Sequence, residues 1–263
     1  MKDLILSPLP PAHPWGQSLY WYDALPSTNS LAKDMAREGA VQGTVLLADS
    51  QSAGRGRLGR SFCSQPGQGI YMSVILRPNC PPSELMHLTC AVGVAVCNAV
   101  EDATGYRPGI KWINDLVAGS KKLGGILTEL VMETGLVRSA VVGIGINCSQ
   151  APEDFPPELQ DIACSLSCVI GRSVDRAKLA AALICRLEEM SRQLQDRSAI
   201  MEDYRRDCVT LGKEILVIQG DHRRPGRALS VQDDGSLMVE FLDGTISTVN
   251  AGEVSVRGLF DYT

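Results

Sequence analysis

Three arginines and three glycines are interleaved in one short segment of this sequence, from Gly54 to Arg60. No Asp or Glu occurs from residue 50 to residue 83, although the whole chain carries a formal net charge of −5. Glycine leaves the backbone free to close on a ligand, and the guanidinium fork of arginine matches the oxygens of a phosphate. The segment therefore predicts an anion-binding loop, and the alternative from composition alone is a solvated surface loop.

The same glycines also fit a second, formal pattern. Gly54, Gly56 and Gly59 have the spacing of a dinucleotide-binding fingerprint, which requires a helix directly after the glycines. Residues 61–69 contain a proline and two glycines and lead into a strand-like run over 70–76, so no helix begins there. This context excludes a Rossmann motif. A P-loop is excluded as well, because no Gly-Lys-Ser/Thr closes the motif.

The elements that must position this segment predict an α+β fold. We expect a mixed, largely antiparallel sheet packed with helices, followed by a small C-terminal β-barrel of SH3 type. Strands of the sheet are expected at residues 19–25, 44–49, 70–76, 109–117, 121–133 and 136–147. Helices are expected at residues 27–37, 84–104, 165–170, 175–194 and 198–206. Strands of the barrel are expected at residues 214–219, 227–231, 236–241, 245–249 and 253–256.

The change from mixed helices and strands to strands alone predicts two domains, residues 1–208 and residues 209–263. The basic triplet His222-Arg223-Arg224 is interpreted as a solvated hairpin turn within the second domain.

At the start of the first predicted helix, Ser27, Thr28 and Asn29 are residues that cap helices, and capping is the simplest interpretation of their position.

Bulk properties exclude several classes of protein. The nine cysteines form no Cys-x-x-Cys pair and the three histidines are isolated, which argues against zinc or iron–sulfur ligation. The N-terminus has no signal-peptide pattern and no apolar run is long enough to span a bilayer, so we expect a cytoplasmic protein with no membrane partner. The net negative charge argues against a nucleic-acid partner and for a small anionic ligand.

Five motifs in order resemble those of the biotin protein ligases. The segment Gly54–Arg60 is similar to that family's Gly-Arg-Gly-Arg-x-Gly-Arg signature, and Ser27–Asn29 matches its Ser/Thr-x-Asn. Residues 111–115, Lys-Trp-Ile-Asn-Asp, resemble its Lys-Trp-Pro-Asn-Asp. Residues 122–129 resemble its Lys-Leu-x-Gly-Ile-Leu-x-Glu, and residues 143–147 its Gly-x-Gly-x-Asn. The motifs and the C-terminal barrel cover almost the whole chain, so the fold expected is that of the biotin/lipoate ligases.

The resemblance implies a two-step ligase. Biotin and ATP, with Mg²⁺, would give biotinyl-5′-AMP and pyrophosphate, and the biotinyl group would pass to a lysine of a biotin carboxyl carrier domain. The catalytic residues implied are Lys122, Arg55 and Arg57. Those implied for biotin are Ser27, Thr28, Asn29, Gln51, Gly54, Arg55, Lys122, Gly124 and Gly125. Those implied for ATP or the adenylate are Arg57, Arg60, Phe62, Trp112, Asn114, Asp115 and Asn147, with Asp115 also a magnesium ligand.

Three departures from the family pattern concern nucleotide affinity rather than the reaction. Phe62 stands where the family commonly has Trp, Gln65-Pro66 replaces its Pro-x, and Ile113 replaces its Pro. Lys121 neighbours Lys122 along a strand, so it should point to the opposite face and be replaceable. The glycines at 124, 125, 143 and 145 are expected to let the backbone approach the ligand.

Two alternatives remain at this stage, a lipoate or other acyl ligase on the same fold and a non-catalytic biotin sensor. Because only about twenty residues precede the first predicted strand, we expect no N-terminal winged helix, no repressor function and no DNA partner. The protein is expected to be a monomer or a homodimer. The loop from Arg55 to Gly67 is expected to be mobile without ligand and to become ordered with biotin or the adenylate.

Overall fold

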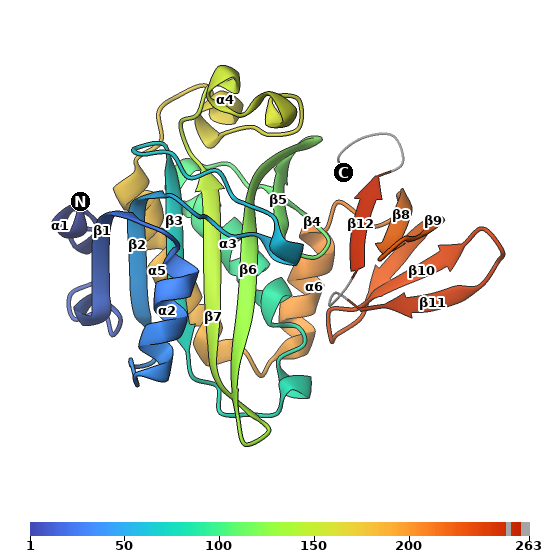
Figure 1. Cartoon of the computed structure of the whole chain (residues 1–263), viewed down its shortest axis with the longest axis horizontal. Coiled ribbons are helices and arrows are strands. Elements are labelled where there is room, and N and C mark those ends of the chain that lie inside the picture. Colours follow the sequence, from blue (N-terminus) through green and yellow to red (C-terminus); the bar gives the residue numbers. More distant parts are fainter. Residues whose placement is uncertain (251–253, 259–263) are drawn as a thin grey trace.

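The computed structural model describes residues 1–250 and 254–258. Its larger part is built on a seven-stranded sheet with the strand order β1-β2-β3-β7-β6-β5-β4 (Figure 1). The strands are β1 (Leu19–Leu25), β2 (Thr44–Gln51), β3 (Gly69–Leu76), β4 (Gly109–Lys111), β5 (Asp115–Ala118), β6 (Lys121–Glu133) and β7 (Leu136–Asn147). Only β1 and β2 run parallel among these neighbours. The predicted mixed, largely antiparallel sheet is thereby confirmed.

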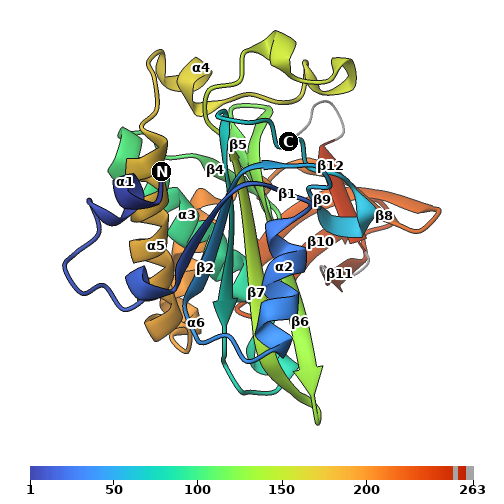
Figure 2. The same cartoon turned by 60° about the vertical axis from the view of Figure 1, so that its left-hand side comes forward.

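Helices cover both faces of this sheet. Helix α2 (Thr28–Arg37) lies on one face, where Ala32 and Ala36 pack against Leu46 of β2 and Ile75 of β3 (Figure 2). On the other face lie α3 (Leu88–Thr104), α5 (Arg176–Gln193) and α6 (Arg197–Asp207). The valine and alanine side chains of α3 fill the main core. The short α4 (Leu166–Ile170) lies at the upper edge of the molecule in Figure 1.

The first eighteen residues also belong to the fold, which sequence reasoning did not anticipate. They form α1 (Lys2–Leu6) and a 3₁₀ turn (Gly16–Ser18) that bring Ile5, Leu9 and Trp15 into the core. A side chain at Gly43 would lie 2.0 Å from the Trp15 ring, so glycine at that position makes room for the tryptophan.

Two predicted elements differ in the structure. The expected strand over residues 109–117 is divided into β4 and β5 by a tight turn at Trp112–Asn114. Helix α3 begins at Leu88 rather than Glu84, because Pro82–Glu84 form a separate 3₁₀ turn. The stretch Pro82–Thr104 is long and apolar enough to cross a membrane by length and composition, contrary to our expectation. In the fold, most of this stretch is α3, a core helix packed against α5 and the sheet.

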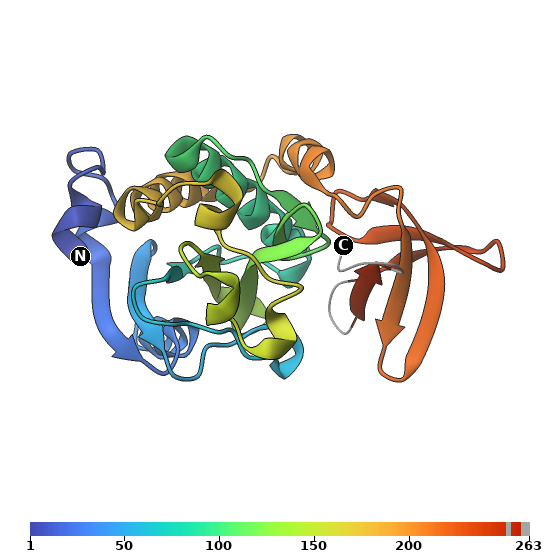
Figure 3. The ribbon, with the colours of Figure 1, turned by 90° about the horizontal axis from the view of Figure 1, so that it is seen from above.

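The C-terminal part is a five-stranded antiparallel sheet with the order β11-β10-β9-β8-β12, consistent with an SH3-like domain (Figure 3). Its strands are β8 (Glu214–Gln219), β9 (His222–Val231), β10 (Leu237–Phe241), β11 (Ile246–Val249) and β12 (Val254–Gly258). The basic residues His222–Arg224 are exposed in the β8–β9 hairpin as expected, but they lie in strand β9 paired with β8, and the turn itself is formed by Gly220 and Asp221. The expected start of the last strand, Glu253, lies outside the described residues.

Candidate functional site

A cavity of about 820 Å³ opens above the middle of the large sheet. Its walls come from the N-terminus of α2, the arginine segment, the turn between β4 and β5, and the centres of β6 and β7. The predicted site residues that line it are Ser27, Thr28, Asn29, Gln51, Arg55, Arg57, Arg60, Phe62, Trp112, Asn114, Asp115, Lys122, Gly125 and Asn147. Residues far apart in the sequence thus converge on one cavity.

Two predicted residues, Gly54 and Gly124, are not part of the cavity wall. A side chain at Gly54 would lie 2.4 Å from the backbone oxygen of Phe62, and one at Gly124 would lie 2.4 Å from that of Gly145. Both glycines therefore allow two backbone segments of the protein to pack closely. The approach of these glycines to a ligand stays a prediction, and what the fold shows is a close approach between two segments of the same backbone.

The Lys122 ammonium group lies 2.6 Å from Asp115 Oδ1, and this ion pair is on the floor of the cavity. A side chain at Gly125 would contact both partners at about 3.5 Å, so the missing side chain leaves the pair accessible from the cavity. Lys121 points elsewhere, since its ammonium group donates to the backbone oxygen of Gln160. The alternation of side chains along β6 therefore separates the two lysines as predicted.

The arginine segment folds over one side of this floor as a small closed loop. Gly56 donates to the backbone oxygen of Arg60, and Arg55 and Ser61 form a β-bridge. A 3₁₀ turn (Arg57–Gly59) directs Arg57 inward, where its Nη1 lies 3.0 Å from Asn114 Oδ1. Burial lowers the pKa of the Arg57 guanidinium, opposed by the charge of Asp115, but the side chain remains a cation at neutral pH.

At the opposite end of the cavity, the start of α2 is tied to the root of the arginine segment. Ser27 caps the helix by accepting from the Ser30 backbone N–H, which confirms the capping interpretation for Ser27. Thr28 and Asn29 lie inside the helix, and their side chains bond to other segments instead. Gln51 Oε1 accepts from the Thr28 backbone N–H at 2.8 Å, while Gln51 Nε2 donates to Ser64 Oγ at 2.9 Å. These contacts hold a row of amide and hydroxyl groups along the cavity wall.

The two glycines of β7 admit protein side chains into the cavity wall. A side chain at Gly143 would lie 2.2 Å from Asn29 Oδ1, and one at Gly145 would lie 2.6 Å from the Phe62 ring. Phe62 also meets Tyr71 edge-on, with ring centroids 6.3 Å apart. Alternate glycines in β7 therefore set the positions of one polar and one aromatic residue of the site.

Several wall residues escaped the sequence reasoning. Phe155, Leu159, Ile162 and Ala163 form an apolar cover, held by a bond from the Lys122 backbone N–H to the Ile162 oxygen. These residues lie within or just after two 3₁₀ turns (Pro152–Asp154 and Pro157–Leu159) and show no regular periodicity from which they could have been predicted. Lys111 is buried and lines the cavity, but it was not among the predicted site residues. It is the first residue of the Lys-Trp-Ile-Asn-Asp motif, so its place in that motif could have identified it.

The donor set suits a magnesium ion that arrives with a nucleotide. Among the described residues, no group of three or more His, Cys, Asp or Glu side chains gathers to hold a metal. Mg²⁺ in phosphate-processing sites keeps several waters and uses one or two carboxylates together with substrate phosphates. Asp115 supplies the carboxylate that this requirement names, while the neighbouring Asn114 turns its amide nitrogen toward Asp115 and its amide oxygen toward Arg57.

Comparisons with known proteins agree with this geometry. The profile of the biotin/lipoate A/B protein ligase family matches residues 21–147. The bifunctional ligase/repressor BirA of Bacillus subtilis is 39% identical over 234 residues, which cover 87% of this chain and 71% of that protein. The biotin–[acetyl-CoA-carboxylase] ligase of Mycobacterium tuberculosis is 34% identical over 237 residues, covering 87% of this chain and 85% of that protein.

Among solved structures, the biotin protein ligase from Aquifex aeolicus in complex with biotin and ATP superposes with a TM-score of 0.78. It is 29% identical, and the match covers 91% of this chain and 98% of that one. The chain belongs to the biotin/lipoate A/B protein ligase family.

Proposed function

We propose that this protein is an ATP-dependent biotin protein ligase. In the first step, a carboxylate oxygen of biotin attacks the α-phosphorus of ATP, and the bond to pyrophosphate breaks to give biotinyl-5′-AMP. In the second step, the ε-amino group of a carrier lysine attacks the acyl carbon and AMP leaves. No covalent enzyme intermediate is needed, so the reaction requires no cysteine nucleophile.

The observation that carries this proposal is the cluster of cations at the cavity floor. The first step brings two anions together, the carboxylate and the α-phosphate, and positive charge must offset their repulsion. Lys122 and Arg57 line the same cavity and are each fixed by a polar partner, Asp115 and Asn114. Groups held in place in this way stabilise a charged transition state without reorganising.

The remaining residues divide between the two substrates. We assign the polar end at Ser27, Thr28, Asn29 and Gln51 to the biotin ring system, since it offers amide and hydroxyl groups to a ureido group. We assign Phe62, Trp112 and Asn147, which line the same cavity, to the nucleotide, and Arg60 to its phosphates. When bound, Mg²⁺ would be held by Asp115 and would neutralise phosphate charge.

Biotin-dependent exchange of pyrophosphate into ATP tests the proposal on the purified protein. We expect exchange that requires biotin. Exchange with lipoate or octanoate in place of biotin would assign the protein to the lipoate branch of the family. Tight biotin binding without exchange for any acid would make it a sensor, an outcome that the cation cluster argues against because a binder needs no phosphate clamp.

The protein partner would be a biotin carboxyl carrier domain, and we propose that it docks on an edge strand of the large sheet. At one edge, β4 is covered because Ile110 bridges to Cys208 and its oxygen accepts from the Val209 backbone N–H. Strand β1 pairs with β2 alone among the described strands, so we assign the docking site to β1. Capture of the carrier that persists after Tyr20, Asp23 and Ala24 are all replaced would contradict this assignment.

We further propose a cytoplasmic location, a catalytic unit formed by residues 1–208 and no repressor function. The net charge of −5 is the property that argues against a DNA partner. A sequence-specific gel shift on the promoter of its own gene at moderate salt would overturn this expectation. Sedimentation of the free protein will distinguish a monomer from a homodimer.

A further inference from the structure

Glu129 on β6 is the meeting point of three residues at the polar end of the cavity. Its carboxylate accepts from Asn29 Nδ2 at 3.1 Å, from Lys33 Nζ at 2.8 Å and from Arg55 Nη1 at 3.1 Å. Asn29 and Lys33 are four residues apart on α2 and thus share one face of the helix. The Glu129 side chain is only 20% exposed. One carboxylate therefore joins a helix, a strand and the arginine segment.

This contact fixes which way the Asn29 amide faces. The amide NH₂ group has two acceptors, Glu129 Oε2 and the backbone oxygen of Leu127. A carboxylate and a carbonyl can only accept, so the opposite orientation would leave three oxygens facing one another. Asn29 Oδ1 must then be the atom that faces Ser73 Oγ, at 2.6 Å.

The polarity set at Glu129 passes along the cavity wall. Because Asn29 Oδ1 can only accept, the single hydroxyl hydrogen of Ser73 is directed to it. Ser73 is fully buried, so with its own hydrogen directed to Asn29 the single Thr28 hydroxyl hydrogen is shared between two oxygens, Ser73 Oγ at 2.8 Å and Gln51 Oε1 at 3.1 Å. Thr28 in turn is bonded to Gln51. The ionised Glu129 on β6 thereby determines that Asn29 Oδ1 is a hydrogen-bond acceptor in this wall.

The charge balance around Glu129 keeps it ionised. Burial alone would raise its pKa, but hydrogen bonds from Lys33 and Asn29 and the charge of Arg55 outweigh burial, so the pKa of Glu129 is below its ordinary value. A neutral acid at this position would offer a donor where three donors already point.

We infer that Glu129 is a positioning residue for the acid substrate, because it sets the donor–acceptor polarity of Asn29 in the cavity wall and of the buried Ser73 that is bonded to Asn29. This inference rests on the proposed function and extends it, since a ureido group carries both N–H donors and a C=O acceptor. Asn29 Oδ1 has a second lone pair, which suits a ligand N–H. Glu129 itself is absent from the cavity wall and acts through Asn29.

The test is the isosteric variant Glu129→Gln, in which one carboxylate oxygen becomes an NH₂ group. If that NH₂ faces Lys33, two donors oppose each other; if it faces Asn29, the Asn29 amide turns over and the wall reverses its polarity. We expect biotin, titrated into the purified protein, to bind about tenfold or more weakly, with ATP affinity unchanged. Glu133→Gln is the matched control, since Glu133 is on the same strand, paired with Arg138 and exposed.

A double variant distinguishes an effect of hydrogen-bond polarity at residue 129 from an effect of side-chain packing there. In Glu129→Gln combined with Lys33→Met, no ammonium group competes, and the glutamine oxygen is free to accept from Asn29 and Arg55. We expect its biotin affinity to return to within about threefold of the Lys33→Met single variant, the non-additivity typical of residues in contact.

Several results would overturn the inference. These are unchanged biotin affinity in Glu129→Gln, an equal loss of biotin and ATP affinity with a lowered melting temperature, or no recovery in the double variant. A wild-type protein that binds no biotin would overturn the proposed function and this inference together. A wild-type protein that binds biotin but shows no pyrophosphate exchange would overturn the ligase proposal alone, and the binding comparison would still decide the role of Glu129.

Discussion

The ammonium group of Lys122 and the carboxylate of Asp115 are 2.6 Å apart, although the β5–β6 register places Lys122 opposite Val117 and Asp115 opposite Gly125. The register shifts between these two pairs, and the side chains meet above a glycine. A lysine held in this way is already oriented toward the cavity before substrate arrives. Its charge is therefore available to the reaction at little cost in side-chain entropy.

Replacing Lys122 with alanine should abolish the first step while leaving the fold intact. We expect biotin-dependent pyrophosphate exchange to fall by about 100-fold or more, the scale on which a preorganised charge contributes. Lys121→Ala is the matched control, because that ammonium group contacts Gln160 outside the cavity and should leave exchange near the wild-type rate. Equal losses in both variants would show that general positive charge, not the position of Lys122, is what matters.

Gly145→Ala should raise the KM for ATP, because the added methyl group would displace the ring of Phe62. The added methyl carbon would lie 2.6 Å from the aromatic ring, too close for the present packing, so the ring must move. We expect the KM for ATP in the exchange assay to rise about tenfold, because a small displacement at a binding residue is costly. The double variant with Phe62→Ala has no ring to displace, and its KM should match that of Phe62→Ala alone. A further rise in the double variant would mean that Gly145 acts by another route.

Trp112→Phe should reveal how the C-terminal sheet supports the site. Trp112 Nε1 donates to the backbone oxygen of Gly235 at 3.0 Å, and its backbone N–H donates to Thr210 Oγ1. The substitution leaves a buried carbonyl unpaired, which costs about 1–3 kcal/mol of unfolding free energy. The turn that bears Asn114 and Asp115 loses the same support, so the KM for ATP should rise as well.

Urea unfolding and exchange kinetics measure these two effects. The control is Trp21→Phe, since the Trp21 ring donates to Asp23, only two residues away, and its loss should change neither quantity appreciably. A Trp112→Phe protein that is destabilised but has an unchanged KM for ATP would limit this bond to a structural role.

The parts of this site that could be predicted from the sequence are those determined by residues that are close together along the chain. The long hairpin of β6 and β7 was placed at its observed bounds, because alternating apolar residues and the Thr134-Gly135 turn specify it locally. Lys122, Asn114 and the arginines converge as the family resemblance implied. The motifs carry these residues at fixed distances from strand ends, so the strand register brings them together.

The parts that were missed depend on contacts between distant segments. The division of residues 109–117 into β4 and β5 is held by Thr210 and by Tyr204, whose hydroxyl donates to the Ile113 backbone oxygen. No periodicity within the segment could indicate those partners. The role of Ser73 was equally invisible, because a lone serine in an apolar strand gives no sign that Thr28 and Asn29 will lie against it.

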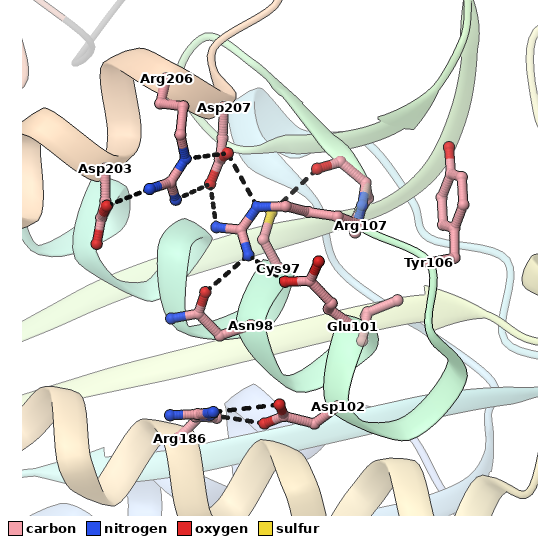
Figure 4. A network of polar contacts seen from close by, with 12 residues as sticks. Cys97, Asn98, Glu101, Asp102, Tyr106, Arg107, Arg186, Asp203, Arg206 and Asp207 are labelled. Carbon is pink, nitrogen blue, oxygen red and sulfur yellow. Dashed lines mark hydrogen bonds and ion pairs between the residues drawn. The ribbon is translucent and has the colours of Figure 1, made fainter.

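An ion network behind the site should make stability sensitive to acid. Arg107 pairs with Asp207 and Glu101 and donates to Asn98, while Arg206 also contacts Asp207 (Figure 4). Burial alone would raise the pKa of Asp207, but the hydrogen bonds from Arg107 and Arg206 outweigh burial and keep its pKa below the ordinary value. The carboxylate thus stabilises the fold at pH values above its unfolded-state pKa.

That contribution is lost as the pH falls through the lower, folded-state pKa of Asp207. We expect the unfolding free energy of the wild type to decrease below about pH 4, and Asp207→Asn to show a shallower decrease. Arg107→Ala should cost about 3–5 kcal/mol at neutral pH, because it leaves a buried carboxylate without its main partner. Urea titrations across this pH range check both statements, and parallel pH curves for the wild type and Asp207→Asn would contradict the first.

The arginine segment should be protected from protease when both substrates are present. Arg55, Arg57 and Arg60 are cleavage sites for trypsin, and the side chains of Arg55 and Arg60 are exposed. Ligands that engage these side chains stabilise the closed loop by mass action, so saturating biotin and ATP should slow cleavage here about tenfold or more. Cleavage after the exposed Arg223 in the C-terminal sheet is the internal control and should not change. Equal rates at the arginine segment with and without ligands would show that its order does not depend on substrate, and the closed loop would then be a permanent wall of the cavity.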